Sequence, residues 1–219
     1  MIQRHGQNHQ GRDFFVGDIH GQLDLLDAEM RRVGFDKAVD RLFSVGDLID
    51  RGARSFDCLS LPFEPWFFGV RGNHEMLAHD AMLRDNDGDW MPHELWMING
   101  GTWAMGENAH EVKAILEAAL DHLPYAREVK VDGKRIGMVH AEPPADWSEV
   151  TRPSLQQQLI WGRTRIKQQD KTPVAGVDAV VVGHTIVGAP ATLGNVHYID
   201  TGAFCTGNLT LIDAREVLA

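Results

Sequence analysis

Three apolar segments near the start of the chain each end at a glycine, and polar side chains follow at once. Phe14–Val16 leads into Gly17-Asp18-Ile19-His20-Gly21, and Leu42–Val45 leads into Gly46-Asp47-Leu48-Ile49-Asp50-Arg51-Gly52. The third segment, Trp66–Val70, leads into Arg71-Gly72-Asn73-His74-Glu75. Short apolar runs bounded by turn residues are typical of buried strands, and open α/β sheets bind ligands at the carboxyl ends of their strands. This spacing predicts a βαβαβ core with a ligand site at that edge.

The rest of the chain predicts helices first and strands later. After Gly21 apolar residues recur at helical spacing up to Val33, and Gly34 is a typical helix stop. Residues 75–123 are predicted to be mainly helical and to cap one side of the site, with a loop at 84–90 and a break at Asn99-Gly100-Gly101. Later strands are predicted at 126–131, 134–139, 177–182, 196–199 and 209–212, with a hairpin turn at Asp132-Gly133. These strands favour an antiparallel sheet.

Size and charge narrow the classes of protein that fit. The 219 residues suit one domain, 1–219, which can bury a core without disulfides. The net charge of −10 argues against a nucleic-acid-binding protein, and no apolar run approaches the roughly 20 residues that span a membrane. Residues 1–11 are polar and lack a signal core, so we expect a frayed lead-in and a cytoplasmic protein. Cys58 and Cys205 are expected to be buried, reduced thiols.

Polar residues that directly follow the predicted strands offer the donors that metal ions prefer: Asp18, His20, Asp47, Asn73, His74, His140 and His184. Carboxylate, imidazole and amide oxygen suit a divalent ion such as manganese, iron or zinc. One ion needs at most about six ligands including water, so donors from this many loops indicate two ions that share a bridging carboxylate. A single His or Asp is more often structural, and the prediction therefore depends on the combined pattern.

The ordered motifs Asp-x-His-Gly, Gly-Asp-x-x-Asp-Arg-Gly and Arg-Gly-Asn-His-Glu, with two later histidines, resemble the phosphoprotein phosphatase family of metallophosphoesterases. More narrowly, the chain resembles the small bacterial and phage serine/threonine protein phosphatases of the lambda type. The resemblance runs from Phe14 to Leu211 and includes Trp96–Gly101, Trp161-Gly162-Arg163 and residues 198–203. It implies an α/β fold in four layers, with two mixed β-sheets packed face to face and helices on the outside.

The resemblance also implies a role for each motif residue. It places Asp47 as a carboxylate that bridges two metals, the first held also by Asp18 and His20 and the second by Asn73, His140 and His184. His74 corresponds to the catalytic histidine and Asp50 to its partner. The arginines that hold the phosphate correspond to Arg51, Arg71 and Arg163, although Arg71 also suits a structural ion pair. The implied cofactor is a pair of divalent ions, manganese first, with iron, zinc or nickel as other occupants.

One position departs from the family pattern. After His140 and Ala141 the chain has Glu142, where relatives carry Asp. This difference concerns the local loop and the choice of substrate, not a metal ligand. The expected chemistry is in-line attack on phosphorus by a hydroxide held between the two ions, with His74 protonating the leaving oxygen and Asp50 fixing the tautomer of His74.

Three functions stay open on the sequence alone. The first is a serine/threonine protein phosphatase, with phosphotyrosine as a further substrate, phosphorylated proteins as partners and a monomeric chain. The second is the symmetrical hydrolysis of diadenosine tetraphosphate, or of another small nucleotide phosphoester, which the metal motifs do not distinguish from the first. The third is a non-catalytic protein that keeps the metal pocket as a binding scaffold, and the presence of the acid and the arginines argues against it.

Overall fold

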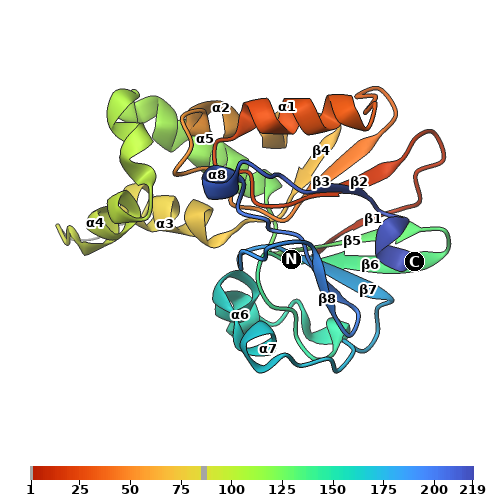
Figure 1. Cartoon of the computed structure of the whole chain (residues 1–219). Helices are drawn as coiled ribbons and strands as arrows, with labels where there is room; N and C mark the ends of the chain where they lie inside the picture. The colour runs from red at the N-terminus through yellow and green to blue at the C-terminus, as the bar shows by residue number, and fades with distance from the viewer. Residues whose placement is uncertain (1, 85–87) are drawn as a thin grey trace.

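The strands lie in two mixed sheets that pack face to face (Figure 1). The computed structural model describes residues 2–84 and 88–219, and over these residues the sheets have four and six strands. The four-stranded sheet has the order β10 (Leu211–Asp213), β2 (Asp13–Val16), β3 (Arg41–Ser44), β4 (Phe67–Gly69). The six-stranded sheet has the order β1 (Ile2–His5), β5 (Ala126–Val131), β6 (Lys134–Met138), β7 (Ala179–Val182), β9 (Val196–Tyr198), β8 (Ala191–Leu193).

Neighbouring side chains along a strand point to different layers, which is why the strands read as continuous apolar runs. Phe15 and Phe43 face the six-stranded sheet and pack with Val129 and Met138 in the central core. Phe14, next to Phe15 in β2, lies instead in the core between the four-stranded sheet and the helices. Both faces of the sheet are therefore buried, and the metal-capable loops at its edge rest on two packed cores.

Helices form the outer layers (Figure 1). The four-stranded sheet is covered by α1 (Leu23–Arg32), α2 (Ser55–Cys58) and α5 (Ala109–His122). The six-stranded sheet is covered by α6 (Gln156–Trp161) and α7 (Thr164–Gln168). At the end of the molecule where the strands stop lie α3 (Asn73–Met82), α4 (Met91–Ile98) and the 3-10 turn η2 (Gly101–Gly106), and α8 (Ala203–Thr206) lies near them. Short 3-10 turns occur at Leu61–Phe63, Trp147–Glu149, Pro153–Leu155 and Glu216–Leu218.

The predicted βαβαβ core and its helices are confirmed. β2, β3 and β4 are parallel and in register, with Phe14 opposite Leu42 and Leu42 opposite Phe67. The helix predicted after Gly21 ends at Arg32, just before Gly34, and the expected break at residues 99–101 separates α4 from η2. The predicted hairpin joins β5 to β6. The loop predicted at 84–90 includes residues 85–87, which lie outside the described residues.

Three expectations were wrong. The second half is not a plain antiparallel sheet, because β6 pairs parallel with β7 and β7 pairs parallel with β9, while β10 joins the other sheet. The start of the chain is not a frayed lead-in: Ile2–His5 forms β1, which pairs parallel with β5. Cys58 is buried as expected, but Cys205 is exposed on α8. The pattern of apolar residues along a strand predicts which of its faces are buried, but it does not predict which other strand it pairs with.

Among the described residues, no helix combines the length and the apolar character that crossing a membrane requires.

Candidate metal centre

The structure brings the strand-end donors of both sheets to one buried place. Asp18 and His20 follow β2, Asp47 follows β3, and the second sheet supplies His140 after β6 and His184 after β7. The loops are tied to each other through the backbone, since the N–H of His20 donates to the carbonyl of Asp47 at 2.8 Å and the N–H of Gly183 donates to that of His140 at 2.8 Å. All seven donor side chains are between 0% and 7% exposed. Such a concentration of buried polar groups needs internal partners.

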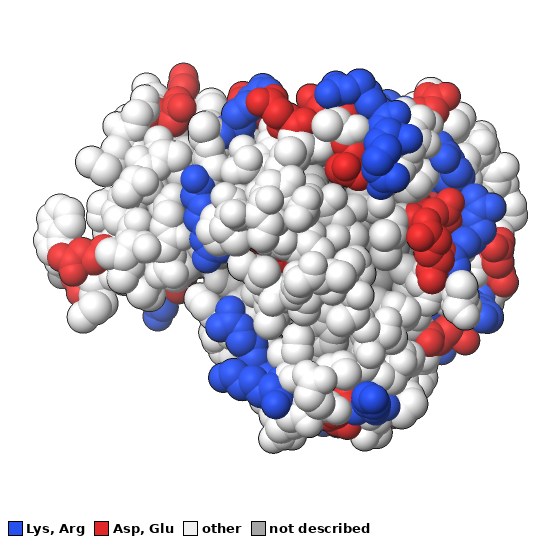
Figure 2. Space-filling view, in the orientation of Figure 1, with Lys and Arg blue, Asp and Glu red and all other residues white. Residues whose placement is uncertain are grey.

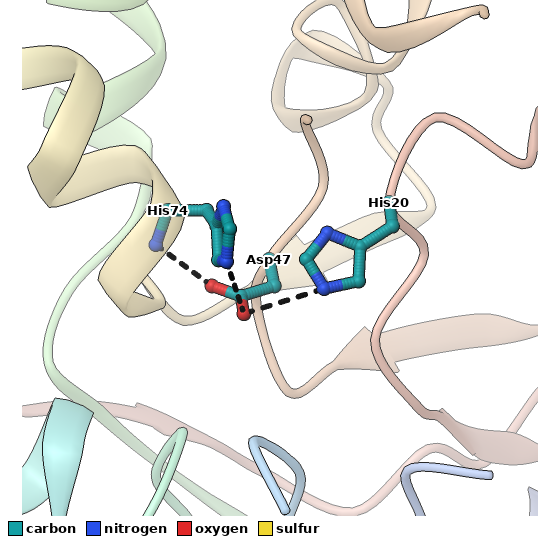
Figure 3. Close-up of side chains that lie close together, drawn as sticks. All are labelled: His20, Asp47 and His74. Atoms are coloured by element: carbon teal, nitrogen blue, oxygen red, sulfur yellow. Dashed lines mark hydrogen bonds and ion pairs between the residues drawn. The ribbon is translucent and has the colours of Figure 1, made fainter. Parts of the chain in front are cut away.

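Asp47 lies at the middle of this cluster (Figure 3). Its Oδ2 is 3.6 Å from His20 Nε2, 3.4 Å from His140 Nε2 and 4.0 Å from His74 Nε2. Two sets of close donor atoms share this carboxylate, one with His20 and His74 and one with His140 and His184. A carboxylate between two imidazole groups has the position of a ligand that bridges two cations.

The backbone fixes which ring nitrogen of each histidine faces the cluster. Nδ1 of His20 donates to the carbonyl of Ile49 at 2.9 Å, and Nδ1 of His140 donates to that of Val45 at 2.7 Å. The second nitrogen of each ring, Nε2, then faces the cluster, which is how proteins orient histidine ligands. In this structure Nε2 of His20 lies 2.8 Å from Arg51 Nη1, and Nε2 of His140 lies 2.9 Å from Asn73 Oδ1. Nε2 of His184 is buried and has no hydrogen-bond partner within the described chain. An orphaned, inward-facing nitrogen of this kind fits a metal ligand.

The electrostatics of the cluster also fit cations. Burial, with the charges of Asp200 and Asp47, raises the pKa of Asp18 well above its usual value. Burial alone would raise the pKa of Asp47 too, but the neighbouring histidines His140, His74 and His20 hold it well below its usual range. Asp18, Asp47 and Asp200 are thus three neighbouring carboxylates less than 4% exposed, and their negative charges repel each other. Divalent ions at these donors would supply the positive charge that compensates them.

Two of the histidines are held in the neutral form that ligands require. Burial, the largest cause, lowers the pKa of His20 to about 3, and burial with the nearby charge of His140 lowers the pKa of His184 to about 3. A neutral imidazole keeps the lone pair that binds a metal.

Backbone conformation sets the site apart from the rest of the fold. Seven non-glycine residues in the described chain have positive φ, and five of them belong to the site: His20, Asp47, Asp50, Arg51 and His184. This left-handed conformation costs about 1–3 kcal/mol for a residue with a Cβ, and it persists only where the surroundings impose it. Its concentration here indicates that the loops are shaped for their side chains.

Two glycines also bring the backbone close to carboxylates of the site. A Cβ on Gly72 would collide with the Asp47 carboxylate, and a Cβ on Gly183 would collide with that of Asp18. Only glycine leaves room for these two carboxylates at such short distance from the backbone.

His74 and Asp50 form a buried pair beside the cluster. Nδ1 of His74 lies 2.7 Å from Oδ2 of Asp50, and the backbone N–H of His74 donates to Oδ1 of Asp47 at 3.0 Å (Figure 3). His74 Nε2 points toward Asp47 and Arg51. His74 thus differs from His20 and His140, whose Nδ1 atoms face backbone carbonyls instead of a carboxylate.

Comparison with known proteins shows sequence similarity over most of the chain. A family profile described as calcineurin-like phosphoesterase matches residues 14–188. The chain belongs to that family. Serine/threonine-protein phosphatase 1 of Salmonella typhimurium is 38% identical over 90% of this chain and 88% of its own length, and serine/threonine-protein phosphatase 2 of Escherichia coli is 32% identical over 95% of both.

Tetraphosphatases match this chain in part by sequence and nearly completely by fold. A symmetrical bis(5'-nucleosyl)-tetraphosphatase of Actinobacillus succinogenes is 50% identical, but over only 21% of this chain and 17% of its own length. The crystal structure of a putative diadenosine tetraphosphatase covers 98% of this chain and 94% of its own with a TM-score of 0.67 at 20% identity, which shows the shared fold.

The three arginines expected at the phosphate lie in different surroundings in this phosphoesterase. Arg51 reaches over the cluster, with Nη1 2.8 Å from His20 Nε2, Nη2 3.0 Å from His74 Nε2 and its guanidinium stacked on Phe204. Arg163 is exposed at the start of α7, close enough to His184 for its charge to lower the pKa of that ring. Figure 2 shows basic side chains over the α6–α7 corner and a second basic strip near α8.

Arg71 has a different environment. It donates from Nε to the carbonyl of Leu123 at 2.6 Å and from Nη2 to that of Leu120 at 2.7 Å, and its guanidinium lies over Tyr125. These contacts hold the C-terminal end of α5 to the loop that follows β4. They favour a structural role over direct contact with phosphate.

Sequence reasoning missed four side chains at the centre. Asp200 follows β9 by the same strand-end rule and could have been found; it lies 3% exposed beside Asp18. Glu75 accepts hydrogen bonds from the backbone N–H groups of Gly72, Asp47 and Leu48, and so joins two of the motif loops. Trp96 and Trp103 both donate to Asp50. No sequence signal reports where an indole N–H or a helix-starting carboxylate will point.

Proposed function

We propose that the chain is a metal-dependent serine/threonine protein phosphatase that hydrolyses phosphomonoesters of proteins. The observation that carries this proposal is the position of Asp47, shared by two groups of donors, with the His74–Asp50 pair beside it. The relatives that match nearly end to end bear the name serine/threonine-protein phosphatase, whereas the symmetrical tetraphosphatases of Actinobacillus succinogenes and Pseudomonas fluorescens match over 21% and 62% of the chain. The presence of an acid pair and two arginines supports an enzyme over a binding scaffold.

The donors divide into two ion sites in this proposal. Asp18, His20 and Asp47 would hold the first ion, and Asp47, Asn73, His140 and His184 the second. When bound, two divalent ions would supply positive charge for the phosphate oxygens and lower the pKa of a bound water. We propose manganese as the native metal, with iron, zinc or nickel as other occupants, because carboxylate, imidazole and amide donors suit such ions.

His74 supplies the proton for the leaving oxygen. Asp50 accepts from Nδ1–H, so the proton to be given away would be carried on Nε2, and Arg51 Nη2, 3.0 Å from that atom, has to move away for Nε2 to be protonated. General acids of this kind contribute about 10²–10⁴-fold in rate. Arg51 and Arg163 hold the phosphate oxygens, because a planar guanidinium donates two parallel hydrogen bonds. Arg51 Nη1 now contacts the same His20 nitrogen that would bind a metal, so Arg51 turns outward when His20 is a ligand.

The decisive experiment compares His74→Asn with the parent enzyme after reconstitution with manganese. We expect kcat on a phosphoserine peptide to fall by about 10²–10⁴-fold while metal content stays at two per chain. Loss of metal from the variant would instead make His74 a ligand and reverse the assignment. Faster hydrolysis of diadenosine tetraphosphate than of the phosphoserine peptide by the parent enzyme would replace the proposed substrate, and activity that survives chelation would remove the metal mechanism.

Several further properties belong to the same proposal. Residues 1–219 act as one domain and as a monomer, with helices at about 75–123 as the cap, and phosphotyrosine is a secondary substrate. Two free cysteines, one of them exposed, suit the reducing cytoplasm. The net charge of −10 supports phosphorylated proteins rather than nucleic acid as partners.

A further inference from the structure

The carboxylate of Asp50 is held by more than its histidine. Trp103 Nε1 donates to Oδ1 at 2.7 Å, and Trp96 Nε1 lies 3.0 Å from Oδ1 and 3.1 Å from Oδ2. Oδ2 also receives His74 Nδ1 at 2.7 Å. Asp50 is 0% exposed, so bulk solvent does not reach its carboxylate. Both oxygens are therefore held by indole N–H groups in addition to His74.

The two indoles come from one segment, which the structure builds around them. Trp96 lies on the inner face of α4 and is 1% exposed, Trp103 is half-buried on η2, and their rings meet edge to face at 6.0 Å. A Cβ on Gly101 would strike the Trp96 ring at 2.7 Å, and one on Gly100, where φ is +113°, would strike Arg51. The Asn99-Gly100-Gly101 break thus lets the segment close over Asp50.

The indole side chain can donate a hydrogen bond through its N–H, but it carries no atom that accepts one. A hydroxyl or an amide could rotate and offer an oxygen to Asp50, whereas a rigid indole in a packed site offers only the donor. Because the two indole N–H groups contact both oxygens of Asp50, the plane of the carboxylate is set, and with it the direction from which Oδ2 accepts the N–H of His74. The arrangement fixes the rotation of the Asp50 carboxylate and, through it, the orientation of the His74 ring.

We propose that Trp96 and Trp103 are positioning residues that act through Asp50 to aim Nε2 of His74 at the leaving oxygen. The inference rests on the proposed function, in which His74 is the acid. It predicts a dependence on the leaving group: serine leaves as a strongly basic alkoxide that needs the proton, whereas p-nitrophenolate leaves without much help. A misplaced acid therefore impairs hydrolysis of phosphoserine more than that of p-nitrophenyl phosphate.

The test replaces each indole by groups that lack the N–H. Trp96→Phe and Trp103→Phe are the simple variants, and 3-benzothienylalanine at either position keeps the ring shape while a sulfur replaces the N–H. We expect kcat on a phosphoserine peptide to fall about tenfold to 100-fold, the effect of displacing a catalytic group by about 1 Å. We expect kcat on p-nitrophenyl phosphate to fall about threefold or less, with manganese content equal to that of the parent.

Trp66→Phe is the matched control, because Trp66 is also buried and donates its N–H to a carboxylate, Glu64, away from the site. Trp66→Phe should leave kcat unchanged on the phosphoserine peptide and on p-nitrophenyl phosphate. Equal losses on both substrates, no loss on either, or loss of manganese from the benzothienyl variants would each overturn the proposal. His74→Asn measured alongside separates the two hypotheses: if it shows the leaving-group dependence and the indole variants do not, only the indole role fails, and if it shows none, the acid assignment itself fails.

Discussion

The strand-end loops and the α4–η2 segment serve the same reaction, but they are built in opposite ways. The loops place Asp18 and Asp47 at 2% exposure between two sheets, with bonds from several directions. The α4–η2 segment has one inner face, which carries Trp96 and Trp103, and an outer face with Ile98 at 81% and Met105 at 79% exposure. Groups that bear charge are thus fixed by the rigid core, and groups that only orient others come from an outlying helix.

Because the two regions are built differently, a displaced side chain should affect a different measured property in each. A displaced group in the loops changes the charge distribution around the metal donors, so metal binding should respond first. A displaced indole in α4–η2 changes only the direction of an acid, so the response should depend on the substrate. Changes on the outer face of α4 should affect neither.

Gly183→Ala should cause the largest loss. Its new Cβ would press on the carboxylate of Asp18 and on Val45 Cγ2, 2.5 Å away. Manganese affinity, measured by titration calorimetry, should fall about 10–100-fold, as it does when supporting contacts of a metal site are disturbed. Gly188→Ala, where a Cβ meets nothing within 4 Å, is the control. Unchanged affinity in Gly183→Ala would show that the loops are softer than we infer.

Glu142→Ala should have a moderate effect on substrate binding. Glu142 accepts from the backbone N–H of Arg165 at 3.1 Å, and Gly162 packs against its Cβ, so it holds the turn that carries Arg163. Loss of one hydrogen bond of about 1 kcal/mol should raise KM for a phosphopeptide about fivefold and leave kcat and manganese content unchanged. Glu142→Gln keeps an acceptor and should lie close to the parent. A fall in kcat with constant KM would argue against this role.

His5 tests a half-buried histidine outside both regions. Burial, then the charges of Arg127 and Arg41, lower its pKa from 6.5 to about 4, so the folded chain resists a proton that the unfolded chain accepts. The free energy of unfolding should therefore fall as pH drops from about 6.5 to about 4, and this contribution should be absent in His5→Gln. Urea unfolding of the metal-free proteins at several pH values measures the difference. Parallel pH profiles would contradict the predicted shift.

Ile98→Ser should have the smallest effect. The residue is exposed on the outer face of α4, and surface substitutions away from special features usually change stability by less than about 0.5 kcal/mol. Its kcat and KM on phosphopeptide and on p-nitrophenyl phosphate should equal those of the parent. A rise in KM for the peptide alone would mean that the outer face touches the substrate, and the contrast between the two faces of α4 would then need revision.

The sequence predicted the part of the structure that local rules determine. Apolar runs that end at glycine located β2, β3 and β4, and the polar residues after them, such as Asp18 and Asp47, do meet at one edge. The strand-end rule also covered His140 and His184, because it does not depend on which sheet a strand joins. Their ligand roles stay predictions until metal content is measured.

The parts that sequence could not predict depend on long-range pairing. Ile2–His5 joins β5 across more than 100 residues, and the polar start of the chain gives no sign of it. The parallel pairing of β6 with β7 follows from how the chain crosses between them, not from strand composition. Trp96 reads as an ordinary core residue in a helical segment, because the direction of its N–H is set only when α4 packs over Asp50.

The left-handed backbone at His20, Asp47, Asp50, Arg51 and His184 bears on how such an enzyme can be engineered. Glycine takes that conformation without steric penalty, so glycine would relieve backbone strain at each of these positions but would remove the functional side chain. A selection that rewards only heat resistance of the metal-free chain would therefore favour glycine at these five positions as much as at Asp132 and Gln169, and activity would be lost with the five. Evolving a more robust form of this protein requires that turnover be scored together with stability.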